Sequence, residues 1–328
     1  MKVHHELAGS LPDFRRAVVT IGTFDGVHLG HRQIISQMKE EASRIDGETV
    51  IITFHPHPRK IISSVPGDIK LLNTLTEKIS LLEAAGIDHL VVVPFDHRFA
   101  NQSAEQYVKD FLYKYFKPHT VIIGYDHRFG KDREGDYLLM KNYGDSLGFE
   151  VNEISEQLMN EIVISSTRIR HSLKENDIAT ANRFLGYPYF FEGIVIEGNK
   201  LGRTIGYPTA NLHISSEEKL IPGNGVYAVT VVRREAAVVS DASAMIHEPL
   251  SMNLFKGMMN IGLRPTVDGK KRVIEVNIFD FDQDIYGETL QVHLQHYLRG
   301  EVKFNGLEEL KIQLQKDQLA AIEVLTNT

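Results

Sequence analysis

Short hydrophobic runs alternate with amphipathic stretches in the first half of the chain. Runs of this length that are rich in valine and isoleucine indicate strands buried on both faces of a sheet. We therefore predict a buried strand at each run. The runs are AVVTIG (17–22), ETVIITF (48–54), DHLVVVPF (88–95), HTVIIGY (119–125) and FEVNEI (149–154).

The stretches between these runs have apolar residues at helical spacing. They are RQIISQMKEEASRI (32–45), TEKISLLEAAG (76–86), SAEQYVKDFLYKYF (103–116) and EGDYLLMKNYGDSLG (134–148). Ser103 and Gln106 have the spacing of a capping box at the start of a helix. Two shorter helical segments, 166–176 and 177–186, close this half. Strands that alternate with helices in this way predict a parallel, doubly wound α/β sheet.

The pattern changes after Pro188, where strand-like segments follow one another without a long helix between them. They are YFFEGIVIEG (189–198), GVYAVTVV (225–232), MNLFKGMMNIG (252–262), KRVIEVNIFDF (271–281) and LQVHLQHYL (290–298). This organisation indicates an antiparallel barrel or sandwich, across which an amphipathic helix at 305–325 should pack. Residues 233–250 have no strong pattern, so we expect a long mobile loop there. We predict two domains, 1–186 and 187–328.

The composition is that of a globular protein with room for two domains. It also argues against some classes of binding partner. The chain has 328 residues, of which 42% are hydrophobic and 24% charged. It has no apolar run of about 18 residues for a membrane helix, and charges stand where a signal peptide needs its apolar stretch. Zero cysteines exclude disulfides, and the net charge of −7 argues against nucleic acid. We expect a cytoplasmic protein that binds small molecules and neither nucleic acid nor membrane, and no oligomer is indicated.

Candidate chemistry begins at TIGTFDGVHLGH (20–31), where the first strand meets the first helix. Ligands collect beyond the carboxyl ends of strands in open α/β sheets. His28 and His31 have three interpretations: they cap the helix, they form a metal site with His55 and His57, or they bind phosphate oxygens.

Phosphate binding is favoured by the glycines of the same stretch. Gly22, Gly26 and Gly30 let the backbone approach a nucleotide closely. Donors arranged in this way stabilise the negative charge that grows on the α-phosphate of ATP during adenylyl transfer.

A second candidate phosphate site is ISSTRIR (164–170), which opens a helix. Ser165, Ser166 and Thr167 offer hydroxyl groups, and Arg168 brings a fixed positive charge. This combination suits a triphosphate tail. The alternative is an ordinary capped helix with surface arginines.

The second half carries its own polar cluster in LGRTIGYPTANL (201–212). Thr209 and Asn211 point the same way in an extended segment, so a hydroxyl and an amide oxygen can face one Mg²⁺. The alternative is a polar turn before a strand. In the strand at 271–281, alternation places Glu275 and Asn277 on one face, opposite the apolar residues.

Together these motifs give a resemblance to a known family. G-x-F-D-G-x-H-x-G-H with ISSTRIR resembles the nucleotidylyltransferase half of the bacterial bifunctional riboflavin kinase/FAD synthetases, which are also FMN adenylyltransferases. TFHPHP (53–58) and GYDHRFGKDREGD (124–136) strengthen the match, although His127 replaces a phenylalanine. LGRTIGYPTANL and NIGLRPTV (260–267) resemble its riboflavin kinase module, with Asn277 where histidine is frequent. The resemblance covers residues 15–328.

The resemblance implies a Rossmann-like nucleotidylyltransferase domain, followed by an antiparallel β-barrel riboflavin kinase domain with a C-terminal helix. The kinase would phosphorylate riboflavin with ATP and Mg²⁺ to give FMN. The first domain would then transfer AMP from a second ATP to FMN, releasing pyrophosphate and giving FAD. The rival hypotheses are a flavin-binding regulatory protein without turnover, and an enzyme with one working module.

The resemblance also assigns roles to individual residues. The catalytic residues would be His28, His31 and Arg168 in adenylyl transfer, and Glu275 as the general base of the kinase. Mg²⁺ would be held by Thr209 and Asn211, and flavin by Pro56, His57, Pro58, Arg264 and Phe304. The nucleotide-binding residues would be Gly22, Phe24, Asp25, Gly26, Gly30, Asp126, Ser165, Ser166, Thr167, Gly202 and Gly206.

Overall fold

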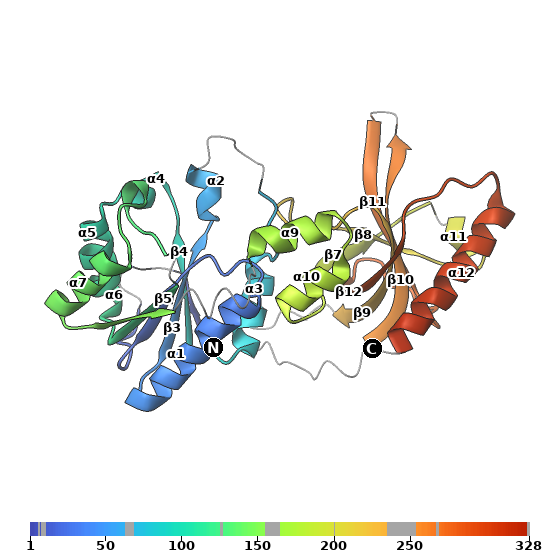
Figure 1. Cartoon of the computed structure of the whole chain (residues 1–328). Coiled ribbons are helices and arrows are strands. Elements are labelled where there is room, and N and C mark those ends of the chain that lie inside the picture. The colour runs from blue at the N-terminus through green and yellow to red at the C-terminus, as the bar shows by residue number, and fades with distance from the viewer. Residues whose placement is uncertain are drawn as a thin grey trace. The chain divides into compact units, whose positions relative to one another are not determined.

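The chain divides by its contacts into two units, Met1–Ser166 and Thr167–Thr328, which are described separately (Figure 1). The structure is a computed structural model. It describes residues 1–5, 7, 11–62, 69–124, 127–154, 165–199, 201–234, 254–266 and 269–326.

The first unit is built on a parallel sheet whose strand order is β1-β4-β3-β2-β5-β6 among the described residues. The predicted parallel sheet is therefore confirmed. The sequence pattern missed β1, because three residues at a sheet edge make no hydrophobic run. The strands are β1 (Lys2–His4), β2 (Val18–Ile21), β3 (Thr49–His55), β4 (His89–Pro94), β5 (Thr120–Gly124) and β6 (Glu150–Ile154).

Helices cover both faces of this sheet. Successive strand residues enter different cores: Val18 and Ile51 pack with Met38 of α1, whereas Val19 and Val50 pack in the core of the later helices. Because both faces are buried, the strands appear in the sequence as continuous hydrophobic runs. The helices of this unit are α1 (Leu29–Ile45), α2 (Pro58–Ile62), α3 (Leu75–Ala84), α4 (His97–Ala100), α5 (Ala104–Gln106), a π-helical turn (Tyr107–Tyr113), α6 (Lys114–Phe116), a 3₁₀ turn (Lys131–Arg133) and α7 (Tyr137–Leu147).

The predicted helix at 103–116 is one helical run with a π-helical centre, formed by α5, the π turn and α6. Its predicted capping box is confirmed. The Ser103 hydroxyl accepts from the backbone N–H of Gln106 at 3.2 Å, and the Gln106 side chain accepts from the Ser103 N–H at 3.0 Å. Two donors at the start of the helix are thus satisfied.

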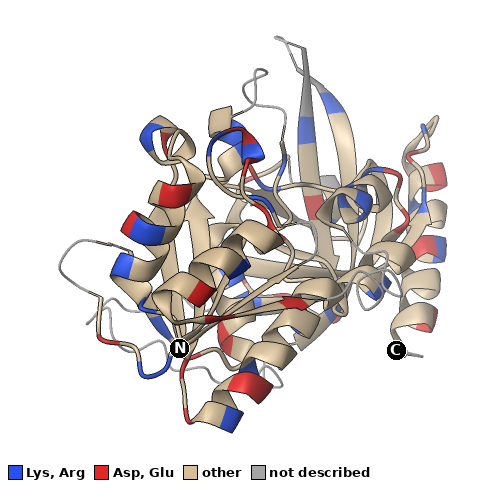
Figure 2. Cartoon of the chain, turned by 60° about the vertical axis from the view of Figure 1, so that its left-hand side comes forward, with Lys and Arg blue, Asp and Glu red and all other residues tan. Residues whose placement is uncertain are grey.

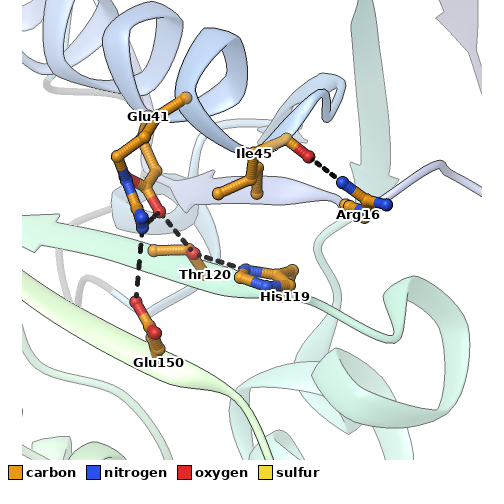
Figure 3. Close-up of polar contacts among 7 residues, drawn as sticks. Arg16, Glu41, Ile45, His119, Thr120 and Glu150 are labelled. Carbon is orange, nitrogen blue, oxygen red and sulfur yellow. Dashed lines mark hydrogen bonds and ion pairs between the residues drawn. The ribbon is translucent and has the colours of Figure 1, made fainter.

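A polar cluster ties the C-terminal end of α1 to the sheet (Figure 3). The Glu41 carboxylate accepts two hydrogen bonds from Arg44, each 2.8 Å long, and one from the Thr120 hydroxyl at 3.1 Å. Arg44 also lies 3.9 Å from a carboxylate oxygen of Glu150 on β6. The hydrogen bond from Arg44 is the main reason that the pKa of Glu41 is lowered from 4.5.

We predict that Glu41→Gln lowers the stability of the protein by about 1 kcal/mol at neutral pH, because it weakens a charge-assisted cluster. A carboxylate with a depressed pKa stabilises the fold above its unfolded pKa of about 4.3 and loses this effect as pH falls through the lower folded pKa. Urea unfolding should therefore separate wild type and variant at neutral pH and bring them together near about pH 3.

The control for this test is Glu105→Gln, which removes an exposed pair with Lys109. It should change stability by at most about 0.5 kcal/mol, as is usual for surface pairs within a helix. Equal urea midpoints for Glu41→Gln and wild type at neutral pH would contradict the stabilising role of the cluster.

The second unit is a closed antiparallel barrel with the strand order β10-β11-β8-β7-β12-β9 among the described residues. The barrel alternative is therefore confirmed over the sandwich. The strands are β7 (Phe190–Ile196), β8 (Ala210–His213), β9 (Gly225–Arg234), β10 (Leu254–Thr266), β11 (Gly269–Ile278) and β12 (Thr289–Arg299), and the helices are α9 (Ser166–Lys174), α10 (Ile178–Leu185), α11 (Leu201–Thr204) and α12 (Leu307–Thr326).

The C-terminal helix α12 packs on this barrel, as predicted. Ala321 and Leu325 share a buried cluster with Met258 of β10. Arg299 of β12 donates two hydrogen bonds to the carboxylate of Asp317, at 2.8 and 2.6 Å. A two-pronged contact of this kind fixes orientation as well as distance.

Helices α9 and α10 pack with the barrel, although the sequence pattern grouped them with the first domain. The backbone N–H of Gly223 donates to the carbonyl of Leu173 in α9 at 3.0 Å. In α10, the side chain of Asn182 donates to the carbonyl of Leu294 in β12 at 2.8 Å. The division by packing therefore falls after Ser166, the first residue of α9, whereas a functional boundary after residue 186 stays a prediction.

Basic and acidic residues are interspersed along the elements of both units (Figure 2). Of the helices that the structure describes, none has both the length and the hydropathy needed to cross a membrane. The predicted loop at 233–250 lies outside the described residues, except for Arg233 and Arg234 at the end of β9.

Candidate functional site

The turn between β2 and α1 has an unusual backbone. Phe24, Gly26 and Val27 have positive φ angles of 48°, 92° and 35°. Positive φ costs a non-glycine residue free energy, and most of all a β-branched one such as valine. Phe24, Asp25 and Val27 are buried, at 2%, 1% and 0% exposure. The surrounding protein must therefore hold this turn in place.

Asp25 holds the turn from inside the protein. Its carboxylate accepts hydrogen bonds from the backbone N–H groups of Leu72 and Asn73, at 2.9 and 3.2 Å. The carbonyl of Asp25 accepts from the hydroxyl of Ser166 at 2.8 Å. The sequence reasoning treated Asp25 and Ser166 as nucleotide contacts, and the structure shows in addition that they fasten the turn.

His28 and His31 lie at the entrance of α1, stacked with ring centroids 3.7 Å apart. His28 is the N-cap of the helix, and its Nδ1 accepts from the backbone N–H of His31 at 3.4 Å. The predicted capping role is thus present. With Nδ1 as the acceptor, a neutral His28 ring carries its proton on Nε2 and can donate it to a ligand oxygen.

His31 is neutral at physiological pH. Burial, followed by the charges of His28 and Lys78, holds the pKa of His31 well below 6.5. Its Nδ1 is buried and has no hydrogen-bond partner among the described residues. The ring also lies 4.8 Å from that of Phe24, so it packs into the turn.

The other predicted residues of the first unit lie on segments that follow neighbouring parallel strands. Pro56, His57 and Pro58 follow β3, which pairs with β2, and the His57 Nδ1 accepts from the Arg59 N–H at 3.2 Å. His127 follows β5, and its ring stacks on Phe129 at 6.0 Å. Because carboxyl ends of parallel strands meet at one edge, these segments flank the turn. Asp126 lies outside the described residues.

Ser166 is also the first residue of α9. Ser165, Thr167 and Arg168 are exposed. The guanidinium of Arg168 lies 5.5 Å above the ring of Phe184 in α10. Gly22 is close to the Phe24 ring, since a β-carbon there would lie 3.2 Å from it, and Gly30 is buried in α1.

The four-histidine metal site finds no support in the described part of the chain. No group of three or more His, Cys, Asp or Glu side chains there is arranged to hold a metal ion.

In the second unit, Glu275 of β11 pairs in register with Asn211 of β8. Paired residues of adjacent strands have side chains on the same face. Thr209 directly precedes β8 and lies two residues before Asn211, a spacing that places side chains on one face of an extended segment. These oxygen donors fit Mg²⁺, which prefers a few hard protein ligands beside phosphate oxygens and water.

Arg264 lies against Glu275. Its guanidinium donates to the Glu275 carboxylate at 2.7 Å, and both side chains are partly exposed. The residue predicted to bind flavin therefore contacts the residue predicted to act as a base. Phe304 is half-buried just ahead of α12.

Asn277 supports this site from within, a role that the sequence reasoning missed. It is 6% exposed, and its side chain donates to the carbonyl of Pro208 at 2.7 Å. Pro208 directly precedes Thr209. In the loop before Pro208, Gly206 has a φ of 85°. A β-carbon on Gly202 of α11 would overlap the carbonyl of Tyr207.

The sequence reasoning also missed Lys78, although the pattern of apolar residues around it indicates a buried position. Leu75, Lys78 and Leu82 share one face of α3, and this spacing marks a buried position. The ammonium group of Lys78 donates to the carbonyl of Thr23 at 2.7 Å.

Two family models match the chain, FAD synthetase over residues 11–168 and riboflavin kinase over residues 185–325. A bifunctional riboflavin kinase/FMN adenylyltransferase of Escherichia coli (strain K12) is 36% identical over 306 residues, which cover 93% of this chain and 92% of the relative. The protein of that name from Listeria monocytogenes serovar 1/2a is 37% identical over 318 residues, covering 96% and 95%.

A solved structure is similar over the same extent. It is described as a macrolide-efflux protein from Streptococcus pneumoniae, is 30% identical, and has a TM-score of 0.80. The match covers 93% of each chain. Both units of this chain therefore occur together in a known structure.

We predict that Asp25→Ala destabilises the first unit by about 2–4 kcal/mol, because it leaves two backbone N–H groups without their acceptor. Asp25→Asn keeps an acceptor oxygen and should cost less. The measurement is urea unfolding, with exposed Asp13→Ala as the control, which should stay within about 0.5 kcal/mol. An Asp25→Ala protein as stable as that control would contradict the role of this carboxylate.

Proposed function

Because the chain belongs to the bifunctional riboflavin kinase/FMN adenylyltransferase family, we propose that it converts riboflavin to FMN and FMN to FAD in two separate sites. The observation that carries this proposal is the match of a different family model to each half, each with its own polar cluster. We propose the predicted division for the two activities, 1–186 and 187–328. The FAD synthetase model ends at residue 168 and the riboflavin kinase model begins at residue 185, so the proposed boundary lies close to the start of the kinase model.

In the first unit, a phosphate oxygen of FMN attacks the α-phosphorus of ATP, and pyrophosphate leaves. The Nε2–H of His28 donates to the phosphate oxygens as charge grows on them. The neutral His31 ring packs behind His28 and keeps it in place. The backbone of Gly22, Gly26 and Gly30 admits the nucleotide at the helix N-terminus.

Ser165, Thr167 and Arg168 hold the triphosphate tail of ATP in this proposal. Support comes from Ser166, whose hydroxyl is bound to the carbonyl of Asp25 in the turn. This contact holds Ser166, the residue next to Ser165 and Thr167, at the nucleotide-binding turn. Phe24 and Asp25 shape the turn, and Asp126 remains a predicted nucleotide contact.

In the second unit, Glu275 accepts the proton of the ribityl 5′-hydroxyl while that oxygen attacks the γ-phosphorus of ATP, and ADP leaves. Arg264 orients the carboxylate through its 2.7 Å hydrogen bond. Thr209 and Asn211 would hold Mg²⁺, which neutralises phosphate charge when it is bound. Gly202 and Gly206 shape the loop that faces the nucleotide.

Flavin contacts are proposed in both units. Pro56, His57 and Pro58 are proposed to contact FMN, and support comes from β3, the strand that they follow, which pairs with β2 ahead of the turn. Arg264 and Phe304 are proposed to contact riboflavin in the barrel. The predicted cytoplasmic location and the absence of nucleic acid and membrane partners stay proposals, supported by the net charge of −7.

The two-site proposal predicts opposite effects of two substitutions. His28→Ala should lower FAD formation about 10²- to 10³-fold and leave FMN formation unchanged, because it removes a phosphate donor. Glu275→Gln should lower FMN formation about 10²- to 10⁴-fold and leave adenylylation of supplied FMN unchanged. The measurement is chromatographic separation of flavins after incubation with riboflavin or FMN, ATP and Mg²⁺.

The outcome of this experiment also separates the rival functions. Loss of both steps from one substitution in folded protein would contradict separate sites. Flavin binding without ATP consumption by the wild-type protein would favour a regulatory binder. Turnover of only one step by the wild type would favour an enzyme with one working module.

We also predict that Asn211→Ala raises the Mg²⁺ concentration needed for half-maximal FMN formation several-fold, because it removes one oxygen donor. The Mg²⁺ requirement of adenylylation should stay the same. The measurement is an initial-rate titration with Mg²⁺ at fixed ATP for each step, with Asn101→Ala as a surface control in the first unit. An unchanged Mg²⁺ requirement for FMN formation would contradict a role of Asn211 in holding the ion.

A further inference from the structure

Lys78 is a buried lysine behind the nucleotide-binding turn. Only 7% of its surface is exposed. Its Nζ donates to the carbonyl of Thr23 at 2.7 Å and to the hydroxyl of Thr53 on β3 at 3.4 Å. Lysine is almost never buried to this degree without a specific partner, because removing an ammonium group from water is costly.

The charges around Lys78 come from the turn and the helix entrance. Burial lowers the pKa of Lys78 to about 8, and the negative charge of Asp25 opposes this shift. In turn, the charges of His28 and Lys78 both lower the pKa of His31. The ammonium group is therefore electrically coupled to both neighbouring elements of the site.

The contacts of Lys78 complete a three-point support of the turn. Thr23, whose carbonyl Lys78 binds, directly precedes Phe24, the first of the positive-φ residues of the turn. The Thr53 hydroxyl donates to the same carbonyl at 3.2 Å. The remaining points are the carboxylate and the carbonyl of Asp25, which are bound from other segments.

From this arrangement, we propose that Lys78 is a positioning residue for adenylyl transfer. It acts through Thr23, by holding the turn so that its backbone and His28 meet the phosphates of ATP. It does not contact the substrate. This inference rests on the proposed function of the turn as the adenylyl-transfer site.

The positive charge of Lys78 has a second consequence within the same site. It disfavours protonation of His31, so the ring behind His28 stays neutral and stacked. A neutral residue of the same length in place of Lys78 would remove this effect.

The experiment uses the full chain with Lys78→Met, which keeps the length of the side chain and removes the ammonium. We expect kcat for FAD formation from FMN to fall about 10- to 100-fold, because small displacements of reacting groups have effects of this size. FMN formation from riboflavin should not change, and it serves as an internal reference. A titration of histidine rings by NMR should show a raised pKa of His31, with its signal assigned through His31→Asn.

The matched control is Lys39→Met. Lys39 is exposed and donates to the carbonyl of Ala85 at 3.2 Å, a lysine–carbonyl contact away from the turn. Its removal should leave both activities and the pKa of His31 unchanged. Lys78→Arg keeps the charge and the donor, so it should retain more FAD formation than Lys78→Met.

If Lys78→Met does not fold, Thr53→Val tests the positioning role of Lys78 instead. This substitution removes only the hydroxyl contacts to Lys78 and Thr23, so it should lower FAD formation by a smaller factor and leave His31 unchanged. Wild-type FAD formation in Thr53→Val would then overturn the proposal.

A folded Lys78→Met protein with wild-type kcat for FAD formation would also overturn it, whatever the pKa of His31. Failure of the underlying site is recognised separately. If His28→Ala also makes FAD at the wild-type rate, the turn is not the adenylyl-transfer site. If His28→Ala is inactive and Lys78→Met is not, only the role of Lys78 is wrong.

Discussion

The adenylyl-transfer unit depends on holding one strained turn in a single conformation. Phe24 and Val27 have positive φ angles of 48° and 35°, which their side chains disfavour. A buried carboxylate on Asp25 and a buried ammonium on Lys78 supply the bonds that offset this cost. Such groups are stable inside a protein only when they are fully bonded. The polar groups of the turn therefore have a structural task before any ligand arrives.

In the barrel, buried and paired polar side chains also hold the residues of the site in place. The Pro208–Thr209 corner is held by the buried side chain of Asn277, and Arg264 holds the carboxylate of Glu275. In both units, a buried polar residue holds a segment whose neighbours we propose to face the substrate. The reactive phosphorus atom belongs to ATP in both reactions. The main task of each site is therefore to hold the phosphates of ATP in the correct position.

Much of the fold could be predicted because its signals are local. Strands such as 48–54 are continuous hydrophobic runs, and the capping box depends on the local spacing of Ser103 and Gln106. The short strand β1 has no such run, since it is stabilised by pairing with β4. The packing of α9 and α10 on the barrel is equally hidden, because helical spacing marks a buried face and not the surface that covers it.

The same difference between local and long-range signals decides which site residues could be predicted from the sequence. His28 and Glu275 belong to short motifs, whereas the partners of Asp25 and Asn277 lie far away in the sequence. The central claim is that each unit binds ATP at its own site. A crystal structure with a non-hydrolysable ATP analogue tests it most directly. The account predicts one nucleotide with its phosphates beside His28 and another beside Thr209. Crystals that show the analogue at neither place would contradict it.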